Sequence, residues 1–474
     1  MRLLLPLMLG LILLGGCHKQ DLEHQPHEKA ILFFTVPNQL GKTEITRTVD
    51  TSRVHINMPK GTDLTAITPR IMVSEGASIT PASGTAINFA ASNNKYTYKV
   101  TGQDGATRDW QVEITEVTNI YDSLVAIPNT GNWEANLLVF HDTVYNRYLT
   151  RYSGWNGGDG CVTTLLPNGN VLWSFQDSFF GSVSADRNRT DNVFVRNAGF
   201  IQLGKSTAAT SYSQLNPTGS DGKAKTWVTV PGVTNGDQEL YWGGPAQVLG
   251  NSVQMVMGHL VLDNTGTLQH QATDVAVFSL PDLQQTNIIR KKYIGALPFD
   301  ASIFKCDDGY TYMYATQSFG ICAANLMVAR AANNDITGNW EFYTKTGWTT
   351  TIPASVDDLQ PILVSNATQP NVFEYNGKFY LVSQTSCFGL DIDIWEGSSP
   401  IGPFTNQRTL YRIPEMYSQP EFISYNSVVH HALSRYGELV ISYNINPVDF
   451  WSNFNNPGSA DRYRPYVVRV FNWQ

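Results

Sequence analysis

The chain has 474 residues, enough for two or three domains, and 42% of them are hydrophobic, as in soluble proteins with well-packed cores. A formal net charge of −8 at pH 7 excludes affinity driven by the phosphate backbone of nucleic acids, so we expect no nucleic acid partner. Charged residues make up only 15% of the chain and aromatic residues 12%, a profile typical of all-β proteins.

The first residues are typical of a secreted bacterial lipoprotein. The apolar segment 3–14 is too short to span a bilayer permanently, which indicates a signal peptide over residues 1–16. Leu14-Gly15-Gly16-Cys17 resembles the bacterial lipobox, which implies lipidation of Cys17. Residues 17–28 then predict a polar tether. We expect a protein at the outer membrane or cell surface that meets the membrane through its lipid anchor only.

Four cysteines remain once Cys17 is set aside: Cys161, Cys306, Cys322 and Cys387. Their spacing fits neither a zinc site nor a CxxC redox pair, so we expect no metal and no cofactor. In an oxidising compartment the four are compatible with a disulfide, and buried free thiols are an equal alternative.

Residues 29–116 predict a small β-sandwich. Residues 30–34 and 54–58 are strand-like, and 96–100 and 110–114 alternate with period two as the arms of a hairpin. No cluster of catalytic residue types occurs in this region.

Two stretches of this region, VSEGASITPASG and YKVTGQDGATRDWQVEI, resemble the immunoglobulin-like spacer domains that follow the lipid anchor in many Bacteroidetes surface lipoproteins. The resemblance implies a spacer between the membrane and the rest of the chain. A weak binding module is the alternative.

A predicted β-hairpin brings two aspartates together. Residues 161–166 are strand-like, residues 167–170 (Pro-Asn-Gly-Asn) are typical of a turn, and residues 171–175 form a second, apolar strand. Asp159 precedes the first strand and Asp177 follows the second. Because a hairpin returns its far end beside its start, we expect both carboxylates at one rim. The alternative is that Asp159 only caps a turn and Asp177 only satisfies the backbone of a loop.

Residues 117–474 contain five copies of a turn followed by an apolar or aromatic strand and a polar residue. The copies are NGNVLWSFQD from Asn168, NSVQMVMGH from Asn251, DGYTYMYATQ from Asp308, NGKFYLVSQ from Asn376 and YGELVISYN from Tyr436. They recur at intervals typical of propeller blades, and no segment of helical period has convincing length. We therefore expect an all-β chain, with an immunoglobulin-like β-sandwich followed by a five-bladed β-propeller over 117–474. A sandwich or barrel is the alternative to the propeller.

The polar residues that end the five copies are Asp177, His259, Gln317, Gln384 and Asn444. We expect each copy to be the inner strand of its blade. Since inner strands run along the central channel of a propeller, these residues are expected to meet on one face. The alternative is that each caps its own turn.

The longest resemblance to a known family lies in this region. GWNGGDGCVTTLLPNGNVLWSFQDSFFG, VRNAGF at 195–200 and ISYNINP at 441–447 resemble five-bladed-propeller glycoside hydrolases formerly classed as domains of unknown function, some of which are endo-D-arabinanases. The resemblance implies that Asp159 and Asp177 are the catalytic pair. Where the family more often has Gly-Asp-Thr, this chain has Gln176-Asp177-Ser178, a departure that concerns substrate choice.

Two aspartates in different surroundings fit the cleavage of a glycosidic bond. One carboxyl must be protonated, to give its proton to the leaving oxygen, and the other ionised, to attack or to activate water. Asp177 ends an apolar strand, so we expect desolvation to raise its pKa and make it the general acid. Asp159, among glycine amides, is expected to stay ionised as nucleophile or base.

Further side chains are expected to bind the sugar, although each is also compatible with a core or turn role. They are Trp155, Asn197, Trp242, His259, Gln317, Gln384 and Asn444. The resulting hypothesis is a surface lipoprotein that hydrolyses a furanose-containing polysaccharide such as D-arabinan. The alternatives are a non-catalytic glycan-binding propeller and a lyase that uses tyrosine or histidine on uronic acids.

Overall fold

The computed structural model describes residues 28–37, 39–59, 61–117, 124–293, 297–319, 322–365, 367–386, 388–414, 421–435 and 437–474. The predicted signal peptide, most of the tether, Cys17, Cys387 and Tyr436 lie outside these residues. The described chain is almost entirely β, with one α-helix, α1 (Thr143–Leu149), so the expected all-β class is confirmed. Short 3₁₀ turns occupy Ala90–Ser92, Leu203–Lys205, Val356–Asp358, Phe450–Asn453 and Ser459–Asp461. No helix in these segments is long and apolar enough to cross a membrane.

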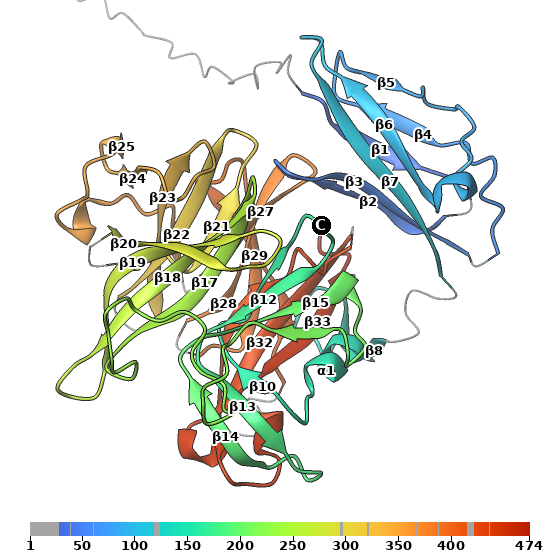
Figure 1. The fold of residues 1–474 in the computed structure, drawn as a ribbon. Coiled ribbons are helices and arrows are strands. Elements are labelled where there is room, and N and C mark those ends of the chain that lie inside the picture. Colours follow the sequence, from blue (N-terminus) through green and yellow to red (C-terminus); the bar gives the residue numbers. More distant parts are fainter. Residues whose placement is uncertain are drawn as a thin grey trace, which may run out of the picture.

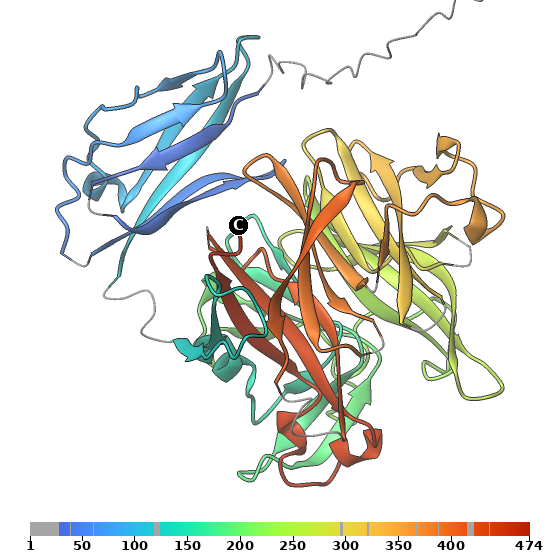
Figure 2. The same ribbon diagram turned by 180° about the vertical axis from the view of Figure 1, so that it is seen from behind.

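An N-terminal β domain lies at one end of the molecule (Figures 1 and 2). Its strands form a two-stranded sheet, β1 (Ile31–Thr35) with β4 (Arg70–Val73), and a five-stranded sheet in the order β2 (Leu40–Arg47), β3 (Ser52–Pro59), β7 (Thr107–Val117), β6 (Lys95–Thr101) and β5 (Ser78–Thr80). The strands expected from the sequence in this region are all present. They enclose a core that includes Phe34, Tyr98 and Trp110.

Five further sheets follow along the chain. The first has the order β11 (Val162–Leu165), β12 (Val171–Phe175), β15 (Ala198–Gln202), β16 (Tyr212–Gln214), and the second β17 (Glu239–Leu249), β18 (Ser252–Leu262), β19 (Leu268–Ser279), β20 (Gln285–Tyr293). The third has β21 (Ser302–Lys305), β22 (Tyr310–Phe319), β23 (Ala323–Ala332), β24 (Trp340–Thr344), β25 (Gly347–Thr349), with β26 (Leu363–Ser365) also paired to β23. The fourth has β27 (Ala367–Tyr375), β28 (Lys378–Thr385), β29 (Asp391–Gly397), β30 (Phe404–Arg412), and the fifth β31 (Phe422–Val429), β32 (Glu438–Pro447), β33 (Pro465–Phe471), β9 (Leu138–Asp142), β8 (Leu124–Ile127).

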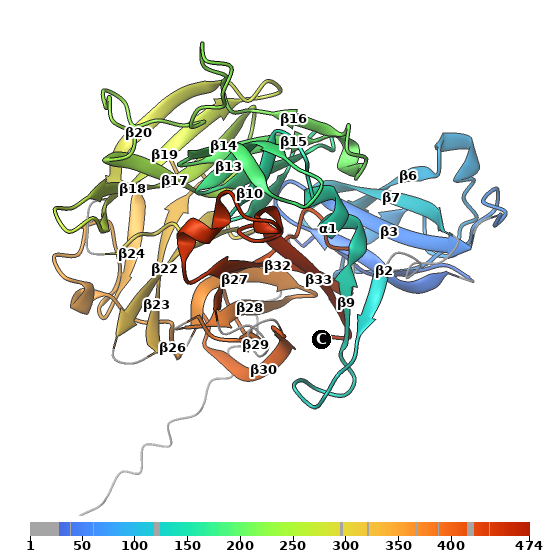
Figure 3. The ribbon, with the colours of Figure 1, turned by 90° about the horizontal axis from the view of Figure 1, so that it is seen from below.

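Successive sheets lie side by side in chain order, from green β15 and β16 to red β32 and β33 (Figure 3). Their first strands, β11, β17, β21, β27 and β31, contact one another in sequence. The repeated segments recognised in the sequence are β12, β18, β22, β28 and β32, which are the second strands of the five sheets. The expectation that they are the innermost strands is therefore wrong. In an antiparallel sheet, first and second strands carry the same apolar pattern, so periodicity does not tell which one faces the neighbouring sheets.

Side chains rather than strand pairing join the fifth sheet to the first. Val440 and Val467 of the fifth sheet share a buried cluster with Val171 and Trp173 of the first. The Thr163 hydroxyl of β11 is 3.0 Å from Nδ1 of His430, directly after β31. A separate N-terminal β domain and five successive sheets are present, whereas a closed five-bladed ring stays a prediction.

The N-terminal domain contacts the turns of the third sheet. Arg47 and Arg108 place guanidinium nitrogens 3.2 and 3.8 Å from Asp307, in the β21–β22 turn. Lys305, which ends β21, forms an ion pair with Asp50. The additional sheet of β10 (Trp155–Gly158), β13 (Ser178–Val183) and β14 (Arg189–Val195) lies at the far end of the molecule (Figure 1).

A buried ion-pair network fixes α1 to the fifth sheet. Asp142 caps the helix by accepting hydrogen bonds from the backbone N–H groups of Val144 and Tyr145, at 3.0 and 2.9 Å. Its second oxygen pairs with Nε of Arg469 at 2.6 Å, and Arg469 also pairs with Glu438. All three charged side chains are nearly inaccessible to solvent, and Glu438 also pairs with Arg435 at 3.1 Å. Removing Arg469 therefore leaves Asp142 without this cation and Glu438 with Arg435 alone.

We expect Arg469→Ala to lower the free energy of unfolding by about 3–5 kcal/mol, because it leaves two buried carboxylates without their shared cation. Lys378→Ala is the control: this side chain is 63% exposed and lies 3.6 Å from Glu396, so its loss is expected to cost no more than about 1 kcal/mol. Urea unfolding of both variants measures the difference. Equal effects would contradict the role given to the buried network.

Candidate active site

The predicted hairpin is confirmed and places Asp159 beside Asp177. β11 and β12 pair antiparallel from Val162 opposite Ser174 to Leu165 opposite Val171. Beyond the ladder, the N–H of Asp159 donates to the carbonyl of Asp177 at 3.2 Å. The two aspartates therefore occupy facing positions on adjacent backbones.

The strands beyond the aspartates pair equally closely. β10, which ends at Gly158, pairs with β13, which begins at Ser178, and these two residues face each other. A Cβ at position 158 would lie 2.3 Å from the Ser178 hydroxyl oxygen, so the close approach requires glycine there. The glycine-rich sequence before Asp159 thus allows the two acidic backbones to meet.

Asp159 is held by two tyrosines of the fifth sheet, one on β31 and one in the connection between β32 and β33. Its Oδ2 accepts hydrogen bonds from the hydroxyls of Tyr425, at 2.9 Å, and Tyr463, at 3.0 Å. Its Oδ1 is buried and has no hydrogen-bond partner among the described residues. Burial raises the pKa of Asp159 to about 6, and the two tyrosine hydroxyls oppose this rise.

Asp177 is more strongly biased toward its protonated form. Burial and the nearby Asp159 carboxylate raise the pKa of Asp177 to about 8, against the opposing effects of the Arg196 guanidinium and the Trp242 indole N–H. Nη1 of Arg196 is 3.6 Å from Oδ1 of Asp177, while Nε of Arg196 pairs with the exposed Asp237 at 3.0 Å. Each aspartate is only 9% exposed. Near neutral pH the pair therefore carries one proton, held mainly on Asp177.

One of the predicted sugar-binding amides lies next to this pair, and a second binds the strand that carries Tyr425. Nδ2 of Asn444 donates to the carbonyl of Gly158, the residue before Asp159, at 2.9 Å. Nε2 of Gln384 donates to the hydroxyl of Ser424 at 2.9 Å. The side-chain oxygens of both amides are buried without a hydrogen-bond partner in the described chain. Such oxygens are suited to accept hydrogen bonds from hydroxyl groups.

Two other predicted sugar-binding residues are structural. Trp155 is fully buried, and its ring packs against Phe175 with centroids 4.5 Å apart, so it is part of the core rather than an exposed platform. Asn197 uses its amide to bind the carbonyls of Val228 and Tyr241 and the N–H of Val228. Its hydrogen-bonding groups are thus occupied by the backbone. The prediction that these two residues bind the sugar is wrong, because the sequence alone carries no information on side-chain exposure.

The remaining predictions fall into different environments. Trp242 is partly buried and acts on Asp177 as described above. His259 binds Glu239 at 2.9 Å and lies 3.9 Å from Asp274, within the second sheet. Gln317 accepts a hydrogen bond from Asn325 at 3.1 Å within the third sheet. Both have local partners, and among the described residues no hydrogen bond or ion pair of either reaches the aspartate pair.

Four side chains that contribute to the site were missed as site residues. Tyr425 and Tyr463 reach Asp159 from positions 266 and 304 residues away, which no local pattern could indicate. Arg196 lies 3.6 Å from Asp177. Arg189 is buried and donates to Asn156 and to the carbonyls of Ser459 and Arg462. It therefore fixes the loop that carries Tyr463.

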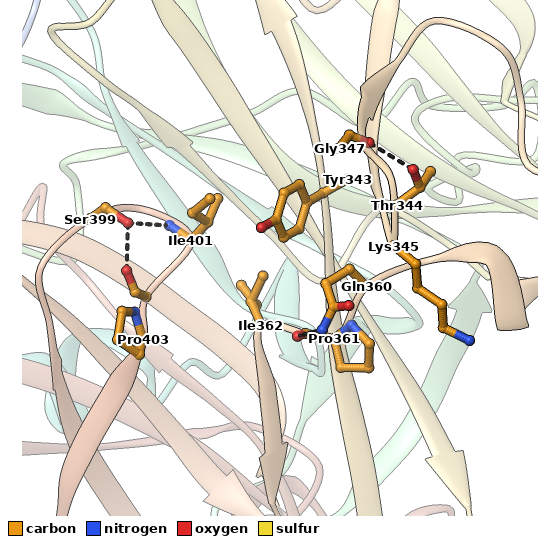
Figure 4. Close-up of a pocket in the computed structure, with 11 residues that line it drawn as sticks. Tyr343, Thr344, Lys345, Gly347, Gln360, Pro361, Ile362, Ser399, Ile401 and Pro403 are labelled. Carbon is orange, nitrogen blue, oxygen red and sulfur yellow. Dashed lines mark hydrogen bonds between the residues drawn. The ribbon is translucent and has the colours of Figure 1, made fainter. Parts of the chain in front are cut away.

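Two hollows lie on the surface of the five sheets. One of 420 Å³ lies between the third and fourth sheets, beside Tyr343, Gln360 and Pro403, and neither aspartate lines it (Figure 4). The other, of 510 Å³, is lined by Phe422, at the start of the strand that carries Tyr425, and by Arg462, next to Tyr463. The second hollow therefore adjoins the two segments that hold Asp159.

The cysteines divide between the two expected states. Cys161 and Cys306 are free and buried, whereas Cys322 is disulfide-bonded. Within the described ranges, no group of three or more His, Cys, Asp and Glu side chains is arranged to hold a metal ion.

Comparisons with known proteins follow the division of the chain into two parts. Residues 142–473 match the family described as Domain of unknown function (DUF5005), and residues 31–114 match the family described as SGBP, N-terminal. No match is found among curated proteins.

Among solved structures, a Bacteroides ovatus protein provisionally classed as a hydrolase is 32% identical with a TM-score of 0.69, over 76% of this chain and 96% of that one. A GH43 protein of Bacillus licheniformis is 9% identical (TM-score 0.38, 69% of this chain, 53% of that one). A GH43 enzyme of Xanthomonas citri is 14% identical (TM-score 0.38, 68% and 92%). The two GH43 matches are too weak to support any conclusion about this chain.

The raised pKa of Asp177 predicts that this residue destabilises the fold at neutral and alkaline pH. The native state holds a proton that the unfolded state releases above about pH 4, so stability falls as pH rises from about 4 to 8. We expect Asp177→Asn to raise the melting temperature at pH 8, by about 1–2 °C for each kcal/mol regained, and to have little effect at pH 4.

Asp109→Asn is the control, since this side chain is 65% exposed and lies 3.8 Å from Lys99 on the surface. Differential scanning calorimetry between pH 4 and 8 measures both variants. The same shift at every pH for Asp177→Asn would show that this carboxyl titrates normally.

Proposed function

We propose that this chain, which belongs to the DUF5005 family, is a glycoside hydrolase whose catalytic groups are Asp159 and Asp177. The observation that supports this proposal is the burial of two facing carboxyls in different surroundings. One favours its protonated form near neutral pH and the other its ionised form. Glycosidic bond cleavage needs one carboxyl in each of these states.

Asp177 is proposed as the general acid. Its carboxyl proton passes to the glycosidic oxygen as the bond from that oxygen to the anomeric carbon breaks, which lets the leaving sugar depart as an alcohol. Arg196 limits the rise of the Asp177 pKa. The carboxylate that remains after the proton has been transferred can therefore exist until it is reprotonated.

Asp159 is proposed as the nucleophile or base. The two tyrosine hydroxyls occupy its Oδ2 and orient the carboxylate, which leaves Oδ1 without a protein partner. Oδ1 is then the oxygen that attacks the anomeric carbon or takes a proton from the attacking water. Because two tyrosine hydroxyls already hold the Asp159 carboxylate in place, the carboxylate loses less conformational freedom when the transition state forms.

The proposals about the propeller, the substrate and the cellular location rest on the family resemblance and on the two regions that match known families. We propose that the five sheets are the blades of a five-bladed propeller over 117–474, with Gln384 and Asn444 binding substrate hydroxyls. The proposed substrate is a furanose-containing polysaccharide such as D-arabinan. The SGBP match over residues 31–114 and the lipobox-like Cys17 support a lipid-anchored protein at the cell surface, with residues 29–116 as its spacer.

A second candidate is a non-catalytic glycan-binding lipoprotein. The match of the N-terminal region to an SGBP family is the observation that favours it. The two candidates differ in one measurable property: both bind glycans, but only the hydrolase releases new reducing ends.

Incubation of the purified protein with a panel of arabinans tests the proposal. We expect the wild-type protein to release reducing sugars, and Asp159→Asn and Asp177→Asn to reduce the rate at least about 100-fold while retaining binding. Asp393→Asn is the matched control, because this buried carboxyl bonds to Gln407 and Thr409 in the fourth sheet. Its activity is expected to match the wild type.

Two results of that assay would contradict the proposal. Binding without cleavage by the wild-type protein would favour the glycan-binding candidate. Products that absorb in the ultraviolet would identify the reaction as elimination by a lyase.

The pH dependence of kcat/KM provides a further test. Activity requires ionised Asp159 and protonated Asp177, so we expect a bell-shaped profile that falls below about pH 6 and above about pH 8. In Arg196→Gln the Asp177 pKa is expected to rise, because a stabilising positive charge is lost. The alkaline limb should then move upward by about one pH unit.

Lys223→Gln removes the same charge from an exposed pair with Asp191 and should leave both limbs in place. An alkaline limb that stays unchanged in Arg196→Gln would exclude Asp177 as the group that titrates there.

A further inference from the structure

An exposed aromatic ring lies next to one of the tyrosines that hold Asp159. Phe388 follows β28 and is 54% exposed. Its ring packs edge-on against Tyr425, with centroids 6.4 Å apart and an interplanar angle of 86°. Because the Tyr425 hydroxyl binds Asp159, only one side chain separates the solvent-facing ring from the carboxylate.

The backbone around Phe388 is held in an unusual conformation. Its φ is +55°, in the left-handed region that bulky side chains rarely adopt. Such conformations persist only where neighbouring contacts enforce them, and they are concentrated at functional sites. The chain accepts this cost in a segment that presents an apolar ring to water.

Two side-chain hydrogen bonds hold this segment in position. The Ser386 hydroxyl donates to the carbonyl of Cys322 at 2.6 Å, and Cys322 is itself disulfide-bonded. The side-chain amide of Gln384 donates to the carbonyl of Gly389 at 2.7 Å, on the other side of Phe388. The ring is therefore presented from a segment fixed at both ends.

The surroundings of Phe388 define what can bind to it. The neighbouring site has carboxylates, tyrosine hydroxyls and amide oxygens, which suit hydroxyl groups. The exposed ring suits an apolar face. A sugar ring has both features, since its hydroxyls lie at the edge and its C–H groups on one face.

We propose that Phe388 is a stacking platform for a sugar unit of the glycan chain beside the unit bound at Asp159. This inference rests on the proposed function and adds a specificity-determining residue to it. A platform fixed beside the carboxylate pair holds a neighbouring unit of the chain, so the site prefers polymers to short glycosides.

Phe388→Ala tests this proposal in kinetics. We expect KM for the arabinan that the wild-type protein cleaves to rise about 3- to 10-fold, with kcat changed less than about twofold, because stacking binds ground state and transition state alike. Phe388→Tyr should keep the wild-type KM, since it retains the ring. The melting temperature should stay unchanged in both variants, as the side chain is largely exposed.

Tyr152→Ala is the matched control. Tyr152 is also 54% exposed, but its ring lies against Arg187 and not against a residue that binds Asp159. Its KM should equal that of the wild type. A wild-type KM in Phe388→Ala would overturn the platform while leaving the hydrolase proposal intact, whereas wild-type activity in the aspartate variants would overturn the hydrolase proposal.

A binding measurement covers the case in which the protein does not cleave. In affinity electrophoresis through gels containing D-arabinan, we expect Phe388→Ala to migrate with at least about threefold weaker retardation than the wild type and Tyr152→Ala. Equal retardation of all three, or no retardation of the wild type, would overturn the platform.

Discussion

The pairing of the backbones at Asp159 and Asp177 is the constraint on which the rest of the site depends. The pairing of β10 with β13 and of β11 with β12 brings two acidic residues into facing positions inside the protein. Two adjacent buried carboxylates cannot both be ionised without a large cost in desolvation and repulsion. The two carboxyls have different surroundings. Asp159 receives hydrogen bonds from two tyrosine hydroxyls, whereas Asp177 keeps its proton to a higher pH. The acid and base roles follow from that inequality.

The rest of the fold supports this arrangement from two directions. The rings of Trp173 and Phe175, both on β12 of the hairpin, stack on each other, and Phe175 packs against Trp155 in the same buried cluster. The N-terminal domain contacts the β21–β22 turn, and β10, β13 and β14 lie at the other end of the molecule (Figures 1 and 2).

Local patterns in the sequence predicted the features that depend on neighbouring residues. The Asn-Gly turn at 168–169 and the alternation around it predicted the hairpin, and the end of an apolar strand at Phe175 predicted the higher pKa of Asp177. The sequence predicted that neighbouring glycine amides would keep Asp159 ionised, whereas the structure raises its pKa. Burial outweighs the hydrogen bonds that this carboxylate receives.

Features that depend on distant residues could not be predicted in this way. Tyr425 and Tyr463 become partners of Asp159 only through the return of the fifth sheet to the first. Trp155 and Asn197 have residue types common in sugar sites, yet one is fully buried in the core and the other is bound to backbone groups. Exposure and long-range contact are tertiary properties, so composition and spacing leave them open.

The most direct test of the central claim is a carbon-13 NMR titration of the aspartate carboxyls, with assignment by the single Asp→Asn variants. The account predicts two coupled titrations above the usual aspartate range, with Asp177 titrating near pH 8 and Asp159 near pH 6. Titration of both carboxyls near pH 4 would contradict it, since neither residue could then hold a proton at the pH where the reaction needs one.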